Sequence, residues 1–340
     1  FPFFMFIMGI STFISLRKFN FEFSVPTLRK ILKRTFVIFL IGLGLSWLGV
    51  SFGTYHGLAA DNLGFWERLS RSVTNFEHLR ILGVMQRLAL AYAGGAFLAI
   101  LIPKKYYLAT AGGILLLYLV LLQCFNGYVH SADNLIAVID VKLLGAGHLI
   151  KEAAEGGSFA FEPEGLLSTI PCWAHVLFGT FVGSLITGIA ENKERIRQIA
   201  LFGTVLLFAG FLLQYLDPIN KKLWTASYTL ITSGTASLLL ALLIDIIDVR
   251  QKKRWCRFFE AFGVNPLFMY VVAWIISVLF GLSFIPWGEA TISVRGIIYN
   301  RTLQPLLGDY AGSLVYALFF IGVIWALGYI LYRKRIYIKL

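Results

Sequence analysis

Two arginines lie inside an apolar segment of this sequence, where a charged side chain needs a chemical reason. Arg80 and Arg87 are seven residues apart in the apolar run 79–102, and Gln86 precedes the deeper arginine. Because seven residues are nearly two helical turns, a helix would carry both guanidinium groups on one face. A charge inside a span costs about 2.5 to 3.5 kcal/mol, and arginine binds phosphate or pyrophosphate bidentately. The pair therefore predicts a site for an anionic ligand, and a structural pair with a carboxylate from another helix is the alternative.

Acidic residues are concentrated before the next group of apolar runs. Glu162 and Glu164 flank Pro163 at the entry of the run 165–189, where carboxylates meet the positive end of the helix dipole. One of them is explained as a helix cap, but hardly both. Asp140 and His148 lie upstream, in a long polar segment that is either functional or a solvated cap.

Two further polar positions interrupt apolar runs. Lys222 lies just before the run 224–247, which begins at Trp224. A lysine at this place opposes the charge trend described below, and the tryptophan also fits an interfacial belt. Asn265 followed by Pro266 inside the run 258–282 predicts a broken or kinked helix, which often lines a cavity.

Composition identifies the solvent that surrounds these residues. Of the 340 residues 58% are hydrophobic and only 14% are charged, and the mean hydropathy is +0.76. These values exclude a soluble or disordered protein, and the long continuous runs exclude an outer-membrane barrel. The prediction is an all-α polytopic membrane protein of nine spans, and these lie at about 1–16, 36–52, 79–102, 106–123, 165–189, 198–216, 224–247, 258–282 and 311–332.

Several function classes find no support in the motifs. The sequence contains no P-loop, dinucleotide-binding, zinc or Ser-His-Asp pattern, and its three cysteines are far apart, so we expect neither a metal nor a disulfide framework. The net charge of +12 follows from loop placement, and nucleic acid is not an expected partner.

The basic residues predict how the chain is oriented. Twenty of the 30 lysines and arginines fall in the segments 17–34, 104–105, 193–197, 250–257 and 333–339. The positive-inside rule places these segments and the C-terminus in the cytoplasm. We therefore expect a single transmembrane domain over 1–340, with cytoplasmic loops 17–35 and 248–257 and outer loops 53–78 and 124–164.

The first apolar run is short for a span. Residues 1–16 would form a helix of roughly 24 Å, less than the ~30 Å hydrocarbon core, and the sequence begins with Phe. We expect a preceding outer loop and one more helix, which would bring the full-length protein to ten spans.

Six stretches, in order along nearly the whole chain, resemble the transmembrane heparan-alpha-glucosaminide N-acetyltransferase family and its bacterial homologues. They are 1–9 (FPFFMFIMG), 80–87 (RILGVMQR), Ile139 and Asp140 with 143–145 (LLG) and 148–149 (HL), 163–170 (PEGLLSTI), 220–228 (NKKLWTASY) and 263–266 (GVNP). Members of that family move an acetyl group from cytosolic acetyl-coenzyme A to the amino group of a terminal glucosamine across the membrane. The resemblance therefore implies an acetyl-coenzyme A dependent acyltransferase with an amino-sugar acceptor. It also implies a homodimer embedded in lipid, and we expect the bacterial inner membrane.

The resemblance also implies roles for particular residues. It favours acetyl-coenzyme A binding by Arg80, Gln86, Arg87 and Asn265, sugar binding by Lys222, Trp224 and Ser227, and catalysis near the amine by Asp140, His148, Glu162 and Glu164. The family's active-site histidine is expected on a loop before residues 1–4, which this sequence does not include, and Glu162 stands where the family more often has Asp. A transporter of anionic sugars or sugar derivatives is the alternative, although the two halves show no internal repeat.

Overall fold

A computed structural model describes residues 1–338 except 59–60, 62, 155–156 and 288–289. The gaps at 59–60, 62 and 155–156 fall in the two predicted outer loops. The chain divides into two compact units, Phe1–Gln251 and Lys252–Leu340, which are described separately. The single-domain organisation over 1–340 stays a prediction.

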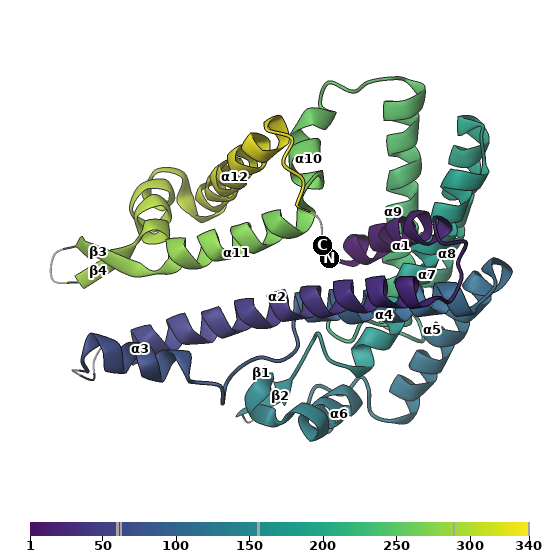
Figure 1. Ribbon diagram of the computed structural model, residues 1–340. Coiled ribbons are helices and arrows are strands. Elements are labelled where there is room, and N and C mark those ends of the chain that lie inside the picture. The colour runs from purple at the N-terminus through teal and green to yellow at the C-terminus, as the bar shows by residue number, and fades with distance from the viewer. Residues whose placement is uncertain (59–60, 62, 155–156, 288–289, 339–340) are drawn as a thin grey trace. The chain divides into compact units, whose positions relative to one another are not determined.

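Unit 1 is helical apart from one hairpin (Figure 1). Its α-helices are α1 (Pro2–Arg17), α2 (Val25–Gly57), α3 (Phe65–Val73), α4 (Val84–Leu101), α5 (Tyr107–Cys124), α6 (Leu135–Leu144), α7 (Ile170–Gly188), α8 (Asn192–Leu213) and α9 (Ala226–Ile244). The antiparallel hairpin pairs β1 (Ile150–Ala154) with β2 (Gly157–Phe161). Short 3₁₀ turns are η2 (Lys104–Tyr106), η3 (Ala146–His148) and η4 (Leu167–Thr169), and the π-helical turn η5 (Asp245–Val249) extends α9.

Unit 2 contains a sharply broken helix pair. Helices α10 (Cys256–Gly263) and α11 (Pro266–Gly281) are bent by 83° at the break. The hairpin of β3 (Ser283–Trp287) and β4 (Ala290–Ser293), the π-helical turn η6 (Gly296–Leu303) and α12 (Gln304–Arg333) follow. The break predicted at Asn265–Pro266 is confirmed, because proline cannot donate the backbone hydrogen bond that a continuous helix needs there.

The predicted all-helical membrane architecture is confirmed. Among the described residues seven helices are long and apolar enough to span a membrane, or eight if the bent pair counts as one span, and α1 is a shorter apolar helix. The chain is therefore an integral membrane protein. The count of nine spans here and ten in the full-length protein stays a prediction.

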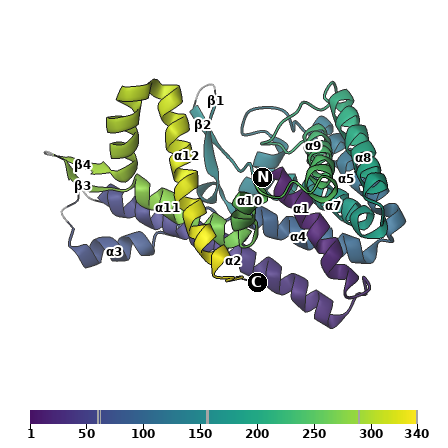
Figure 2. The same ribbon diagram turned by 90° about the horizontal axis from the view of Figure 1, so that it is seen from above.

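Helix α7 lies at the centre of unit 1, packed against α1, α4, α5 and α9 (Figure 2). Small residues allow this packing: a Cβ added to Gly9 would lie 2.9 Å from Gly179 Cα, so the backbones of α1 and α7 approach closely. In lipid such close packing supplies the contacts that the hydrophobic effect supplies in water.

The run 79–102 differs from its prediction in one consequential way. Helix α4 begins only at Val84, and Gly83 before it has an extended backbone. Arg80 therefore precedes the helix, and the prediction that Arg80 and Arg87 share one helix face is wrong. The physical reason is that Arg80 forms ion pairs with two carboxylates on another segment, as described below.

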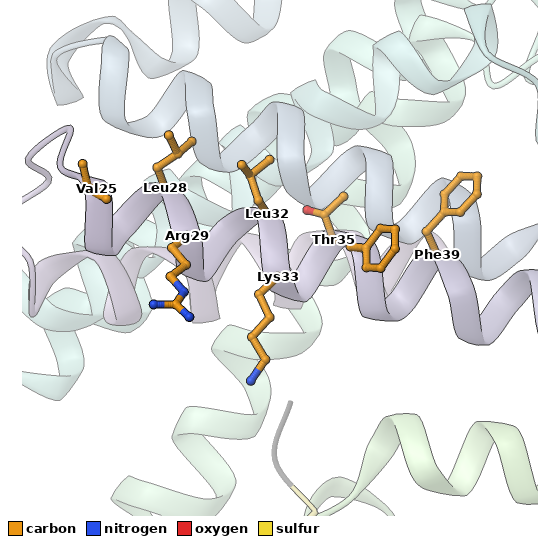
Figure 3. A pocket seen from close by; sticks show the side chains of 8 residues that line it. Val25, Leu28, Arg29, Leu32, Lys33, Thr35 and Phe39 are labelled. Carbon is orange, nitrogen blue, oxygen red and sulfur yellow. The ribbon is translucent and has the colours of Figure 1, made fainter.

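The run 36–52 is only the centre of its helix. Helix α2 begins at Val25, so the connection between α1 and α2 is 18–24, shorter than the predicted loop 17–35. An open surface pocket of about 740 Å³ lies along the N-terminal half of α2 (Figure 3). Arg29 and Lys33 point to one side of the helix there, and Leu28 and Leu32 point to the other. All its lining residues belong to α2, so it is separate from the polar groups described next.

Candidate functional site

Arg80 is the centre of an ion-pair network between two segments far apart in sequence. Its Nε donates to Glu162 Oε2 at 2.9 Å, and its Nη2 donates to Glu162 Oε1 and to Glu164 Oε2, both at 2.6 Å. Glu162 is fully buried. For Arg80 the alternative interpretation, a structural pair with a carboxylate, therefore describes the geometry.

The two sides of this network shift each other's ionisation. Burial opposes the charge on Arg80, but the carboxylates of Glu162 and Glu164 more than offset it and raise the pKa of Arg80. Burial raises the pKa of Glu162, against the opposing effect of the Arg80 hydrogen bonds. Since both oxygens of Glu162 accept from one guanidinium, this residue is a carboxylate in the structure.

Arg87 differs from Arg80 in its partners. It is fully buried in α4, and its Nη2 donates to Pro163 O at 2.5 Å and to Ser168 Oγ. Its guanidinium carbon lies 4.8 Å above the centre of the Trp224 ring. Its Nε and Nη1 have no hydrogen-bond partner among the described residues. Buried donors without a partner cost free energy, so each of these two nitrogens, which donate from different edges of the guanidinium, is suited to an incoming acceptor oxygen.

Asp140, on α6, reaches the same turn from the other side. Its Oδ1 accepts a hydrogen bond from Leu166 N at 3.0 Å, whereas its buried Oδ2 has no partner among the described residues. Burial raises the pKa of Asp140 to about 6, and the nearby Glu162 adds to the rise. A Cβ at Gly165 would fall on Oδ2, so only glycine fits beside this carboxylate.

His148, in η3, lies beside the start of the Arg80 segment. Its Nδ1 is 2.8 Å from Leu79 O. Because a carbonyl oxygen only accepts, Nδ1 carries the proton and Nε2 is the basic nitrogen of the neutral ring. The geometry thus gives His148 an orientation suitable for a base or a proton carrier.

Trp224 lies inside the unit, with its side chain fully buried. Its Nε1 donates to His175 Nδ1 at 3.3 Å, and His175 Nε2 lies 2.8 Å from Thr232 Oγ1. That hydroxyl donates to Tyr228 O, so His175 Nε2 must be the donor to it. Both ring nitrogens of His175 are therefore engaged within the protein, as in a hydrogen-bonded packing residue.

The remaining residues predicted to bind the sugar have protein partners as well. Lys222 is half exposed and forms an ion pair with Glu152 at 2.8 Å. Ser227 is buried, and its N–H donates to Asp217 Oδ2 at 3.0 Å, while Tyr128 donates to the other oxygen at 2.6 Å. Burial raises the pKa of Asp217.

The residues predicted to bind acetyl-coenzyme A do not form one set. Arg80 is paired with carboxylates, and Arg87 keeps Nε and Nη1 unpartnered among the described residues, where the buried Gln86 likewise has an unpartnered Nε2. Asn265 belongs to unit 2, where its side-chain amide donates to Ile336 O at 2.8 Å and accepts from Ile338 N at 2.7 Å.

Some residues at this site were not predicted as functional. Ser168 and Gly165 each touch a predicted residue, and Glu152 pairs with another. The Pro-Glu-Gly sequence before the run 165–189 was the available signal, because a proline and a glycine so close together predict a turn with special backbone demands. Among the residues that the structure describes, no group of three His, Cys, Asp or Glu could hold a metal ion.

Comparison with known proteins gives this arrangement a context. Heparan-alpha-glucosaminide N-acetyltransferase of Mus musculus is 26% identical over 317 residues, which cover 80% of this chain and 46% of that protein. The Homo sapiens protein of the same name is 26% identical over 158 residues, covering 43% of this chain and 24% of its own length. This chain is distantly related to the heparan-alpha-glucosaminide N-acetyltransferases. The resemblance noted from the six stretches is thereby confirmed.

The relationship to heparan-alpha-glucosaminide N-acetyltransferase has a limited extent. The chain spans about half the length of its mouse relative. No family model matches the chain.

Proposed function

We propose that this chain is a membrane-embedded N-acetyltransferase that moves an acetyl group from acetyl-coenzyme A to the amino group of a glucosamine-type sugar. The name of its relatives supports acyl transfer to nitrogen. The single structural observation that carries the proposal is Arg87, a fully buried guanidinium with two nitrogens unpartnered among the described residues.

Acetyl transfer to an amine makes two demands that Arg87 and its neighbours meet. The thioester carbonyl gains negative charge in the transition state, and preorganised N–H donors stabilise that charge. Arg87 Nε and Nη1 are such donors, because Ser168 and Pro163 O hold Nη2 and fix the orientation of the guanidinium. The attacking amine must also lose a proton, and Asp140 and His148 are the nearby groups suited to accept one.

The sugar and donor residues take supporting roles in this proposal. Trp224 lies against Arg87 and offers an aromatic surface, Lys222 precedes it on the connection before α9, and Ser227 lies in the first turn of α9. Gln86 adjoins Arg87, and Glu162 and Glu164 hold Arg80 in place. Asn265 is assigned to the donor as a separate contribution from unit 2.

The location and assembly follow from the charge distribution and the resemblance. We propose a bacterial inner-membrane protein with a cytoplasmic C-terminus, surrounded by lipid and forming a homodimer. The excess of lysine and arginine in the inner segments supports this orientation.

Calorimetric titration of acetyl-coenzyme A into the detergent-purified protein tests the proposal. We expect micromolar binding that weakens at least tenfold in Arg87→Lys, which keeps the charge but loses the planar fork. The matched control is Arg71→Ala, because Arg71 is exposed and pairs only with Glu67. Equal losses in both variants, or no binding by the intact protein, would contradict the proposal and favour the transporter.

A further inference from the structure

The charged side chains around Pro163 do not balance. Two guanidinium groups, Arg80 and Arg87, face the three carboxylates of Glu162, Glu164 and Asp140. With every group ionised the cluster therefore carries one net negative charge. A buried net charge is expensive, so it is either neutralised by a proton or paired with a bound ion of opposite sign.

One carboxylate oxygen of this cluster lacks a hydrogen-bond partner. Both oxygens of Glu162 accept from Arg80, and Glu164 Oε2 accepts from the same guanidinium. Asp140 is fully buried, and its Oδ2 has no partner among the described residues. Asp140 Oδ2 is therefore the buried oxygen of this cluster that is suited to accept from an incoming cation.

A buried aspartate elsewhere in unit 1 shows that this arrangement is not general. Asp217 is equally buried, but Tyr128 donates to its Oδ1 and Ser227 N donates to its Oδ2. A purely structural carboxylate is satisfied in this way. Among the described residues Asp140 Oδ2 has no partner, and Arg87, within electrostatic reach of Asp140, has two nitrogens without one.

We propose that Asp140 Oδ2 binds the protonated amine of the acceptor and takes its proton. The inference rests on the proposed function and deepens it, because it selects one residue among the four that were assigned to the amine. It also reverses part of the expectation for this cluster: the excess negative charge favours an ammonium group, whereas the arginine pair alone predicted an anion.

The proton and electron pairs balance in this step. The ammonium transfers one proton to Asp140, and the resulting amine uses its lone pair to form the C–N bond with the acetyl carbon. The C–S bond breaks and its electrons remain on the coenzyme A sulfur, which takes the second proton from the nitrogen. Asp140 then releases its proton to solvent, and Arg87 faces the carbonyl oxygen throughout.

Acceptor binding without donor isolates this role. Glucosamine and glucose differ by the amine, so the ratio of their dissociation constants measures the contribution of the ammonium group. We expect the intact protein to bind glucosamine at least tenfold more tightly than glucose, and Asp140→Asn to reduce that ratio to about one. Asp133→Asn, an exposed residue in the same outer segment, is the control that keeps the ratio. An unchanged ratio in Asp140→Asn would overturn the inference.

A pH series on the unmodified protein covers the case in which Asp140→Asn does not fold. An ordinary amine with a pKa of about 8 stays protonated below neutral pH. The glucosamine preference should therefore fall by about tenfold per pH unit once Asp140 is protonated. The charged and titratable groups on or around α6 are Arg87, Glu162, Glu164, His148 and Lys142. The series is repeated in His148→Gln, and a preference that does not change between pH 5 and 7 there contradicts the inference.

The two proposals fail in different ways. If the intact protein does not bind acetyl-coenzyme A, the proposed acetyltransferase function is contradicted. If the amine preference does not depend on Asp140, only this inference is contradicted.

Discussion

At the residue scale, the two arginines of one apolar run have different chemical states. Arg80 lies outside the helix and donates hydrogen bonds to two carboxylates, with which it forms ion pairs. Arg87 lies inside α4 and keeps two nitrogens unpartnered among the described residues. The first is a structural cross-link and the second is suited to a ligand, so substitutions at the two positions should have different consequences.

Arg80→Ala should mainly reduce stability. The substitution leaves the buried Glu162 carboxylate without its counter-charge and with the backbone N–H of Glu164 as its donor, and breaking a buried pair in this way costs about 3–5 kcal/mol. Thermal unfolding of the detergent-purified protein measures the loss. Arg71→Ala is the matched control, because it breaks an exposed Arg–Glu pair worth about 0–1 kcal/mol. Similar melting temperatures for the two variants would show that Glu162 does not depend on Arg80.

Asp140→Asn should stabilise the protein above pH 6 while removing its amine preference. Burial raises the pKa of Asp140 to about 6 from an ordinary value of 3.8, so the folded protein holds a proton that the unfolded chain releases. The contribution of this group to stability is therefore present below pH 4 and is lost as the pH rises to 6. At about 1.36 kcal/mol per pH unit the loss is about 3 kcal/mol. Asparagine has no such ionisation.

Unfolding free energies at pH 4 and pH 7 check this prediction. The difference between the Asp140→Asn variant and the unmodified protein should grow between the two pH values. Asp133→Asn, at an exposed site, should show no such growth. A variant that is less stable than the unmodified protein at pH 7 would mean that Asp140 is a satisfied structural carboxylate.

The sequence predicted the residue types of this site better than their pairing. Arg87 could be selected because a charge inside a span is costly, Glu162 and Glu164 because they flank a helix entry, and Asp140 because of the family resemblance. That Arg80 meets Glu162 across 82 positions depends on how α4 and the turn at Pro163 pack, and no local pattern contains that information. From the sequence, Gly165 could be recognised only as a turn residue. In the structure, Asp140 Oδ2 lies where a Cβ of residue 165 would be.

At the element scale, the approach of α1 to α7 depends on glycines. A Cβ on Gly179 would lie 2.9 Å from the carbonyl carbon of Phe6 and 3.1 Å from Gly9 Cα. Gly179→Ala should therefore force the two backbones apart and cost about 1–3 kcal/mol. Gly112→Ala in α5 is the control, because nothing lies within 4 Å of its added Cβ and alanine favours the helix.

Thermal unfolding of the two glycine variants gives the comparison. A lower melting temperature for Gly179→Ala alone confirms that the backbone contact holds α1 against α7. If both variants melt like the unmodified protein, α1 can move away from α7 without cost.

Element existence was more predictable than element boundaries. Every predicted apolar run contains a helix, because a run of that length in lipid has to satisfy its own backbone groups. The ends depend on neighbours: α2 begins eleven residues before its predicted run and includes the stretch 25–35, and α4 starts five residues late. The hairpins β1–β2 and β3–β4 lie in connections that hydropathy does not describe.

At the scale of the whole molecule, the charge distribution is an argument about orientation. The segments rich in lysine and arginine alternate along the chain with segments that have fewer of them. One of the latter, 124–164, carries Asp140, His148 and Glu152. An amine acceptor site at Asp140 is therefore expected on the outer side, whereas acetyl-coenzyme A is a cytosolic compound. This separation makes the orientation a premise of the proposed reaction.

Cysteine labelling in bacterial spheroplasts tests that premise. Single cysteines replace Asp133, in the predicted outer loop 124–164, and Lys253, in the predicted cytoplasmic loop 248–257, in a Cys124→Ser background because Cys124 is the exposed native thiol. A membrane-impermeant thiol reagent should label Asp133→Cys at least tenfold more than Lys253→Cys. After the membranes are opened the two should label equally, since both positions are exposed.

The C-terminus provides an independent position for the same experiment. Lys334→Cys should behave like Lys253→Cys, because the positive-inside rule assigns the segments 250–257 and 333–339 to one side. Preferential labelling of Lys253→Cys and Lys334→Cys from outside would show that the predicted orientation is reversed. Asp140 would then face the cytosol, on the same side as acetyl-coenzyme A. The acceptor would have to reach the cytosolic side, and the two reactants would no longer come from opposite sides of the membrane. The orientation therefore decides whether the proposed site can join a cytosolic donor to an outer acceptor.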